Sequence, residues 1–372
     1  MTYKNSRILL VSSMIMMLVL VPILQAIPAA LATSASTGIV IPLYSYPYDG
    51  STFVWNSVNT TKNDHPDVPL FVIINPNSGP CDLLAGCPDP NYKKGIANLT
   101  KSGVVVLGYL DTLNGLRLQS LVEDDIQDYS DWYKQYGLKG VFFDQMNNAD
   151  GGESYYQDLT NYAKGAAGLT YTFGNPGTDT QTSYVETGTA DVLDIFENGA
   201  LPTISGLQAA TFATTEAFNK QSFSFLSYAQ SSLPSEQLIG NFSNFVGYMY
   251  LTADSGSNPW DTIASYLSTL ASYLDRPTAI ITINSVGPSG PITGYFIGVT
   301  QNGTQIPSGG YTPLAYNGTT GVVYHFIPND FGFCQFDKWQ DTGSTNPDRA
   351  ILVNSTSATF TAVYKNNGGT CQ

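Results

Sequence analysis

Short apolar runs recur from residue 36 to residue 274, and stretches with helical periodicity separate them. Most of these runs are continuous in β-branched and aromatic residues and show little alternation. This is typical of strands that are covered on both faces of a parallel sheet. The pattern predicts eight strands, at residues 38–46, 70–77, 104–112, 140–146, 169–176, 192–199, 223–230 and 245–254.

The stretches between the strands predict helices. Residues 118–137 place five large side chains on one helical stripe, namely Leu121, Ile126, Tyr129, Trp132 and Tyr133. Gly137 suits the C-terminus of this helix, and Pro259 indicates that another helix begins near it. Residues 155–166 have a similar amphipathic pattern.

The alternation of strands and helices predicts the fold class. Eight strand–helix units within about 240 residues match an α/β fold, a (β/α)8 barrel of the TIM type, here over residues 36–276. An open, doubly wound sheet is the alternative. No G-x-G-x-x-G motif follows any of the strands, so a dinucleotide site is not indicated.

The pattern changes after the barrel segment. In residues 277–372, turn signals such as "GPSGP" and "NNGG" separate short alternating runs such as "GVVYHFIP" and "ATFTAVY". They predict a small antiparallel β-sandwich-like domain, with the boundary near Arg276 and Pro277. The aromatic segment 331–339, "FGFCQFDKW", has two interpretations. We favour the core of this domain over a sugar-binding platform.

The N-terminus has the features of a targeting segment. Lys4 and Arg7 precede the apolar run "ILLVSSMIMMLVLVPIL", and "ALA" at residues 30–32 supplies small residues for cleavage. Residues 1–32 are therefore predicted to be a signal peptide, with an uncleaved membrane anchor as the alternative because the run is long. In both cases the remaining chain is expected to be secreted or on the cell surface.

The four cysteines agree with export. An even number in an exported chain predicts two local disulfides, Cys81–Cys87 and Cys334–Cys371. A zinc site would need tighter spacing or nearby histidines, and only His65 and His325 exist, so no metal is expected. Glycosylation sequons occur at Asn59, Asn98, Asn241, Asn302, Asn317 and Asn354.

Charge narrows the class of partner. The chain has 15 Lys and Arg against 29 Asp and Glu, a formal net charge of −14. Nucleic-acid binding needs basic patches that pair with phosphates, so no nucleic-acid partner is expected. A neutral or cationic partner fits this surface better than an anionic polymer.

Polar and aromatic residues collect where the predicted strands end, which in such a barrel is the site of the chemistry. For any single one of these residues, the simplest explanation is that the strand ends there and meets solvent. Asp144 and Glu197 are different, because they directly follow the apolar runs "GVFF" and "VLDIF". Burying an acid beside so much apolar surface costs several kcal/mol unless it is paired or has a function.

Asp144 and Glu197 would lie two strands apart and face each other across the barrel mouth. Two carboxylates in a cleft of tyrosines and amides are what glycoside hydrolysis requires. We therefore predict that Asp144 and Glu197 are catalytic and that no cofactor is needed. The predicted substrate-binding residues are Tyr44, Asn75, Tyr109, Asp111, Gln145, Asn175, Tyr228, Tyr250 and Asp254. Without a G-x-S-x-G motif, and with only two histidines, a serine hydrolase is not indicated.

A family resemblance supports this interpretation. The runs "GIVIPLYSYP", "FVIINPNSGP", "GVFFDQ", "YYQDLTNYAK", "NPGT", "FEN" and "YLTAD", in this order between about residues 38 and 274, resemble the spherulin-4-like family. Members include fungal glycoside hydrolases that cleave α-1,4-linked N-acetylgalactosamine in galactosaminogalactan, and a related family cleaves its galactosamine-rich stretches. The resemblance implies that Asp144 and Glu197 match the family's catalytic aspartate and essential glutamate.

One position departs from the family. The usual Asp-Glu pair is Asp144-Gln145 here, and Gln145 cannot act as a general acid or base. Gln145 points into the cleft beside Asp144 only where the strand has ended or bulged. The expected function is an exported glycoside hydrolase acting on an α-linked amino-sugar polysaccharide, with Glu197 as general acid/base and Asp144 as nucleophile or stabilising charge, or with these roles exchanged. The alternatives are a non-catalytic carbohydrate-binding protein and a structural envelope protein.

Overall fold

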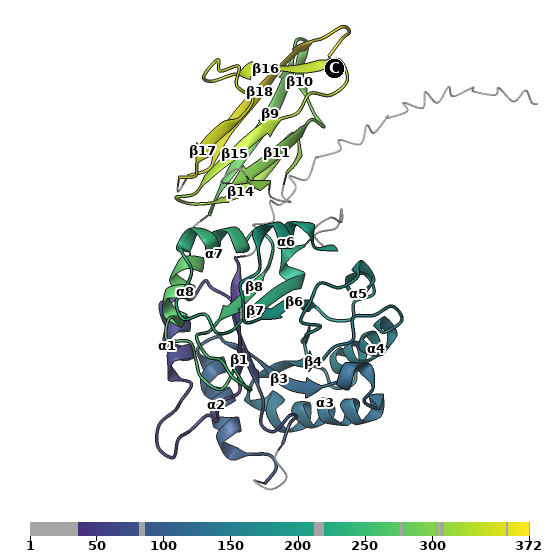
Figure 1. Cartoon of the computed structure of the whole chain (residues 1–372), viewed down its shortest axis with the longest axis vertical. Helices are drawn as coiled ribbons and strands as arrows, with labels where there is room; N and C mark the ends of the chain where they lie inside the picture. The colour runs from purple at the N-terminus through teal and green to yellow at the C-terminus, as the bar shows by residue number, and fades with distance from the viewer. Residues whose placement is uncertain are drawn as a thin grey trace, which may run out of the picture. The chain divides into compact units, whose positions relative to one another are not determined.

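The computed structural model in Figure 1 describes residues 36–81, 86–211, 219–275, 278–301, 304–305, 309–354 and 356–371. The predicted targeting segment, the sequon at Asn302 and the predicted boundary at Arg276–Pro277 lie outside the described residues. No helix in the described part is long and apolar enough to cross a membrane.

Eight parallel strands form a closed barrel, in which each strand pairs with the next and the last pairs with the first. They are β1 (Gly38–Leu43), β2 (Leu70–Ile74), β3 (Val105–Asp111), β4 (Leu138–Asp144), β5 (Tyr171–Gly174), β6 (Val192–Asn198), β7 (Phe223–Ser227) and β8 (Tyr248–Leu251). This confirms the predicted barrel and each of its strands. Most strands end earlier than predicted, because the polar residues after them leave the sheet and form the mouth.

Helices cover the outside of the barrel (Figure 1). Those described are α1 (Asn56–Asp64), α2 (Pro90–Lys101), α3 (Gln119–Tyr133), α4 (Glu153–Lys164), α5 (Thr182–Glu186), α6 (Ile204–Ala209), α7 (Glu236–Phe242) and α8 (Leu267–Leu274). On α3, Val122 is buried whereas the predicted Leu121 is 48% exposed, so the predicted stripe was one residue off there. Gly137, with a left-handed φ of 111°, ends the helical segment as predicted.

The last barrel helix begins at Leu267 and not near Pro259, so that prediction was wrong. Two backbone groups between these residues bond to the barrel. The carbonyl of Trp260 accepts from the Tyr44 N–H at 3.1 Å, and the Ala264 N–H donates to the Tyr250 hydroxyl at 2.9 Å. These contacts hold the β8–α8 segment over the end of the barrel.

An aromatic layer fills the barrel interior. Phe71, Phe142, Phe173 and Tyr248 come from four different strands, and their ring centroids lie between 4.9 and 6.3 Å apart in the pairs that touch. Such rings bury large apolar areas and prefer the edge-on and tilted arrangements seen here. The layer fills the barrel beneath the C-terminal ends of the strands.

The C-terminal residues form two five-stranded sheets. The first contains β9 (Thr278–Gly287), β10 (Gly290–Ile292), β14 (Leu314–Thr319), β16 (Cys334–Trp339) and β18 (Ala358–Asn366). The second contains β11 (Phe296–Gln301), β12 (Thr304–Gln305), β13 (Gly310–Tyr311), β15 (Val323–Pro328) and β17 (Arg349–Leu352).

Rings from the two sheets pack against each other, as expected for a sandwich-like arrangement. Tyr316 of β14 lies 5.0 Å from Tyr324 and 5.4 Å from Phe326, both on β15. One pairing departs from the predicted antiparallel pattern, because β9 and β18 are parallel. The connection between these strands is long enough to carry the chain through both sheets before it returns, so β18 can run in the same direction as β9.

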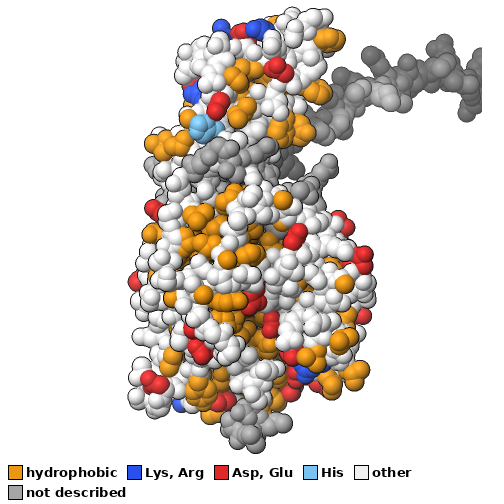
Figure 2. Space-filling model, in the orientation of Figure 1, with side chains coloured by type: hydrophobic (Ala, Val, Ile, Leu, Met, Phe, Trp, Pro, Cys, Tyr) orange, Lys and Arg blue, Asp and Glu red, His pale blue; other side chains and the backbone are white. Residues whose placement is uncertain are grey.

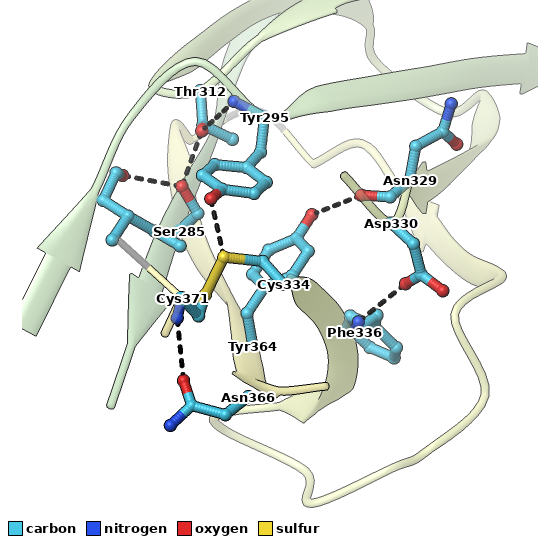
Figure 3. The surroundings of a disulfide bond; sticks show 11 residues. Ser285, Tyr295, Thr312, Asn329, Asp330, Cys334, Phe336, Tyr364, Asn366 and Cys371 are labelled. Carbon is cyan, nitrogen blue, oxygen red and sulfur yellow. Dashed lines mark hydrogen bonds between the residues drawn. A yellow bond between two sulfur atoms is a disulfide. The ribbon is translucent and has the colours of Figure 1, made fainter. Parts of the chain in front are cut away.

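Both predicted disulfides, Cys81–Cys87 and Cys334–Cys371, are present. Figure 3 shows the second, where the Tyr295 hydroxyl donates to Cys334 Sγ at 2.7 Å. The neighbouring aromatic segment divides into two parts. Trp339 is buried, in agreement with the interpretation of this segment as core. Phe331 and Phe333 are 72% and 58% exposed and do not fit that interpretation.

Candidate active site

The barrel mouth is lined by side chains that continue the inward-facing rows of the strands. Residues two apart on a strand face the same side. Phe142 and Phe173 belong to the interior aromatic layer, so Asp144 and Asn175, two residues further along, face the mouth. Figure 2 shows acidic side chains among hydrophobic ones near the middle of the barrel face.

Asn175 joins the two predicted catalytic carboxylates. Its side-chain Nδ2 donates to Asp144 Oδ1 at 2.8 Å and to Glu197 Oε2 at 2.6 Å. Because one nitrogen contacts both, these two oxygens are at most about 5.4 Å apart. The amide has one hydrogen for each carboxylate, so it holds two acids side by side that would otherwise repel each other.

Asp144 is held by several donors. The Tyr109 hydroxyl donates to its Oδ2 at 2.7 Å, and the ring of Tyr44 stands edge-on to that of Tyr109 at 5.5 Å. Burial raises the pKa of Asp144, while hydrogen bonds from Tyr109, from the Gln145 backbone N–H and from Asn175 act to lower it. These donors favour the charged form of a partly buried carboxylate.

Glu197 has fewer donors. Burial raises its pKa and the charge of Asp144 adds to this, while hydrogen bonds from Asn175 and from the side chain of Trp260 act to lower the pKa. Trp260 was missed by the sequence reasoning, which read this position only as part of a helix start. Its ring also packs edge-on against Tyr228, at 5.9 Å. Its place in "NPWDT", directly after the last strand, is the one signal that could have found it.

A β-bulge in β6 turns Glu197 toward the mouth. Asp194 pairs with Ser224, but Glu197 pairs with Leu226, so β6 has one more residue than β7 between the two pairs. Without the extra residue, positions three apart on a strand would face opposite sides. The loop after β5 fills the bulge, since the Gly177 N–H donates to the Asp194 carbonyl and its own carbonyl accepts from the Glu197 N–H, at 3.1 and 3.0 Å.

Gly177 has a φ of +66°, in the left-handed region. A side chain there would have space, but an L-residue in this conformation costs about 1–2 kcal/mol. We expect Gly177→Ala to lower stability by about this amount and to reduce activity by displacing Glu197. Urea unfolding and steady-state kinetics measure both effects. The exposed Gly188, which also has a positive φ but lies outside the site, provides the control as Gly188→Ala: its stability should fall similarly while kcat is retained.

The bulge also places a third acid inside the barrel, which the sequence reasoning overlooked. Asp194 has no exposed surface, and its Oδ1 accepts from the Ser224 hydroxyl at 2.9 Å. Burial, followed by the charge of Glu197, raises the pKa of Asp194 well above its ordinary value. An acid within the apolar run "VLDIF" was the available signal.

Gln145 and Asp111 border Asp144. Gln145 lies just beyond the end of β4, is exposed, and has a left-handed φ of 50°. Its carbonyl accepts from the Asn114 N–H at 2.8 Å. Asp111 pairs with Asp144 across β3 and β4, and its Oδ1 accepts from the Leu113 N–H at 2.8 Å. Asp111 therefore caps its own loop and contributes negative charge near Asp144, which acts to raise the pKa of Asp144.

The remaining predicted residues differ in their access to a ligand. Asn75 and Tyr228 continue the inward rows of β2 and β7, and the Asn75 Oδ1 is buried without a hydrogen-bond partner. Tyr250 has no exposed surface, since it lies beneath Trp260. Asp254 uses its carboxylate within its own loop, accepting from the Thr262 hydroxyl at 2.6 Å and the Ser255 N–H at 2.8 Å. Neither of the last two lies with the Asp144–Glu197 pair.

His65 and His325 take no part in this cluster. Each pairs with a carboxylate elsewhere, His65 with Asp275 and His325 with Asp348. Within the described ranges, no group of three or more His, Cys, Asp or Glu side chains is arranged to hold a metal ion. The chemistry that this cluster can perform is that of two hydrogen-bonded carboxyl groups beside aromatic rings at the barrel mouth.

Comparison with known proteins identifies the family to which the barrel segment belongs. A sequence profile of spherulation-specific family 4, Spherulin4, matches residues 38–274, which span all eight barrel strands. The chain belongs to the spherulin-4 family. Spherulin-4 of Physarum polycephalum is 32% identical over 240 residues, a match that covers 63% of this chain and 69% of the relative.

A solved structure resembles this spherulin-4 family member as well. Sph3 of Aspergillus clavatus, crystallised in complex with GalNAc, matches with a TM-score of 0.57 and 25% sequence identity. The match covers 65% of this chain and 99% of Sph3. The spherulin-4 family segment ends at residue 274, so the family match does not include the C-terminal sheets.

Proposed function

We propose that this protein is an exported glycoside hydrolase that cleaves an α-linked polysaccharide containing galactosamine or N-acetylgalactosamine. The observation that carries the proposal is the Asp144–Asn175–Glu197 bridge, which holds two partly buried carboxyl groups together at the barrel mouth. The binding of GalNAc to Sph3 supports an amino-sugar substrate. The net charge of −14 suits a polymer with free amines.

The donors around each carboxyl group support one assignment of the catalytic roles. Asp144 is stabilised as an anion by Tyr109, by the Gln145 N–H and by Asn175, so it is the nucleophile. Glu197 has fewer donors and lies beside that charge, which favours its protonated form, so it is the general acid. A separation of about 5–5.5 Å suits a retaining mechanism, whereas inverting enzymes separate the carboxyl groups by about 6.5–9.5 Å.

The proposed reaction has two steps. In the first, Glu197 gives its proton to the glycosidic oxygen while an Asp144 oxygen bonds to the anomeric carbon and the bond to the leaving sugar breaks. In the second, Glu197 takes a proton from water, the water oxygen bonds to the anomeric carbon, and Asp144 is released. Tyr228 and Tyr44, which are partly exposed, offer ring surface for the sugar, and Asn75 offers an oxygen without a hydrogen-bond partner for a hydroxyl.

Gln145 is the observation that supports the competing proposal, a carbohydrate-binding protein without activity. The family's glutamate is absent at this position, and a carbohydrate-binding protein without activity would need only the cleft. In the mechanism above, however, the residue contributes its backbone N–H to Asp144, and a glutamine supplies that N–H as well as a glutamate does. Its side chain is exposed and is left to contact sugar hydroxyls.

The decisive experiment incubates the chain from Thr33 onward with α-1,4-linked galactosamine oligomers and, separately, with N-acetylgalactosamine oligomers. Mass spectrometry of the products is expected to show shorter oligomers. Oligomers that stay intact but bind the protein would support the carbohydrate-binding protein instead. Neither cleavage nor binding would reject both. The two disulfides support the export part of the proposal.

The pH dependence should follow from the two carboxyl groups. Activity rises as Asp144 loses its proton and falls as Glu197 loses its own, and burial raises both pKa values above their ordinary 3.8 and 4.5. We therefore expect a bell-shaped profile of kcat/KM whose acid limb lies above pH 3.8. Trp260→Phe removes a donor to Glu197 and should move the alkaline limb to higher pH. Full activity at pH 3 would contradict this assignment.

A further inference from the structure

A cavity lies within the C-terminal sheets, outside the segment that matches the family. Its volume is about 490 Å³, within the range of about 300–1,000 Å³ that is typical of small-molecule sites. It is lined by the connection between β15 and β16, the start of β16, and the loop before β17. A cavity of this size accommodates a sugar unit.

Polar groups with free hydrogen-bonding capacity converge on this cavity. In the described part of the chain, the side chains of Asn329, Gln335 and Thr345 make no hydrogen bond. Asp330 uses its Oδ1 to accept from the Phe336 N–H at 2.7 Å, as Figure 3 shows, and its Oδ2 remains available. None of the residues that line the cavity is Lys or Arg, so the site suits hydroxyls and amines and not anions.

Aromatic rings border the polar groups. Phe336 forms part of the cavity wall and is held edge-on by Trp339 at 5.8 Å and Tyr364 at 6.2 Å. Phe331 and Phe333, in the segment that leads into the cavity, are 72% and 58% exposed. Two exposed rings in one short turn favour contact with the apolar faces of a ligand.

The segment that presents these rings is rigid. The backbone groups of Phe331 and Cys334 exchange two hydrogen bonds of 3.0 Å across a tight turn, in which Gly332 has a φ of 57°. Cys334 is fixed by its disulfide to Cys371, and the Phe333 carbonyl accepts from the Asn367 N–H at 2.8 Å. The backbone that carries both rings is therefore already ordered, which lowers the entropy cost of binding a ligand there.

We infer that the C-terminal sheets carry a second saccharide-binding site, in which the cavity takes one sugar unit and Phe331 and Phe333 contact the apolar faces of the next. Amides, a hydroxyl and a carboxylate beside aromatic rings are the groups that bind a neutral or amine-bearing sugar. The choice of a hexosamine as that sugar rests on the proposed function of the barrel. The site would keep the enzyme on a polymer while the barrel cleaves it, because two linked sites raise the effective concentration of substrate.

The test uses the chain from Thr33 onward with Glu197→Gln, so that no turnover occurs. Isothermal titration calorimetry with α-1,4-linked galactosamine oligomers is expected to show two sites per chain. Adding Phe331→Ala and Gln335→Ala should abolish one site and weaken retention on the insoluble polymer by about tenfold or more. Leu352→Ala, which removes a 53% exposed side chain from β17, is the matched control and should leave both sites.

Three results would overturn the inference: a single site in the parent that survives the Phe331→Ala and Gln335→Ala changes, two sites that both survive these changes, or no binding of the oligomers. An unchanged unfolding midpoint shows that the double variant folds, and Gln335→Ala alone provides a milder version. With Glu197 restored, the double variant should hydrolyse short oligomers at the parental rate. Two sites without any hydrolysis would reject the proposed barrel activity and leave this inference standing.

Discussion

Glu197→Gln is expected to lower kcat/KM for oligomer hydrolysis by about 10³-fold or more, with the fold retained. The substitution keeps the shape of the side chain and its contacts with Asn175 and Trp260, but it removes the proton that must reach the leaving oxygen. The protein should still bind oligomers, because the aromatic lining of the mouth is unchanged. Rates measured at several substrate concentrations would separate a loss of kcat from a change in KM.

Glu186→Gln is the matched control, since it makes the same chemical change on an exposed residue at the end of α5. It should leave both kinetic constants within about twofold. If Glu197→Gln kept more than about a tenth of the parental kcat, Glu197 would not be the general acid. Nor could Glu197 then be the nucleophile, because a glutamine cannot form the glycosyl–enzyme bond, so this result would reject the two-carboxylate mechanism in both assignments of the roles.

Asn175→Ala is expected to lower the free energy of unfolding by about 3 kcal/mol at pH 7, since it removes two hydrogen bonds to carboxylates and leaves both partly buried. Without the amide, the folded-state pKa of each acid rises further above its unfolded value. An acid with a raised folded-state pKa loses stability as pH rises, because the unfolded chain gives up the proton first. The deficit should therefore be smaller at pH 4 than at pH 7.

Urea unfolding at the two pH values would measure this difference. Asn75→Ala provides the control, because it removes an inward-facing amide whose Oδ1 has no hydrogen-bond partner. Its cost should be below about 1 kcal/mol and should not depend on pH. An equal cost for Asn175→Ala at both pH values would mean that the amide does not act through the ionised carboxyl groups. Activity should fall together with stability in Asn175→Ala, since the spacing of the acids is lost.

Much of the barrel could be predicted because its signals are local. Continuous apolar runs identified all eight strands, and the polar residues after them identified Asp144, Asn175 and Glu197. What the sequence could not supply depends on contacts between distant segments. The bulge in β6 exists because Gly177 from another loop pairs with it, and Trp260 reaches Glu197 because the β8–α8 segment bonds to Tyr44 instead of forming a helix.

In the C-terminal region, too, the sequence alone could not decide between two interpretations. Aromatic residues at 331–339 predict either a core or a ligand surface, and only the fold separates them. Trp339 lies on β16 beyond a bulge between Phe336 and Lys338, which brings it to the buried side of the strand, whereas Phe331 and Phe333 flank a turn that projects them outward. Alternation could not be applied across that turn, because the glycine at position 332 interrupts it.

The bulge in β6 has a consequence for how sequences of this kind can change. Asp194 and Glu197 face the same interior only because two residues, Ile195 and Phe196, occupy a span that needs one. Deleting either would turn Glu197 outward, among the helices, and would leave every other strand intact. Selection on this strand therefore acts on its length. Family members that share the proposed activity should keep two residues between the acids even where both residues differ, and a shortened spacing would predict that this activity is absent.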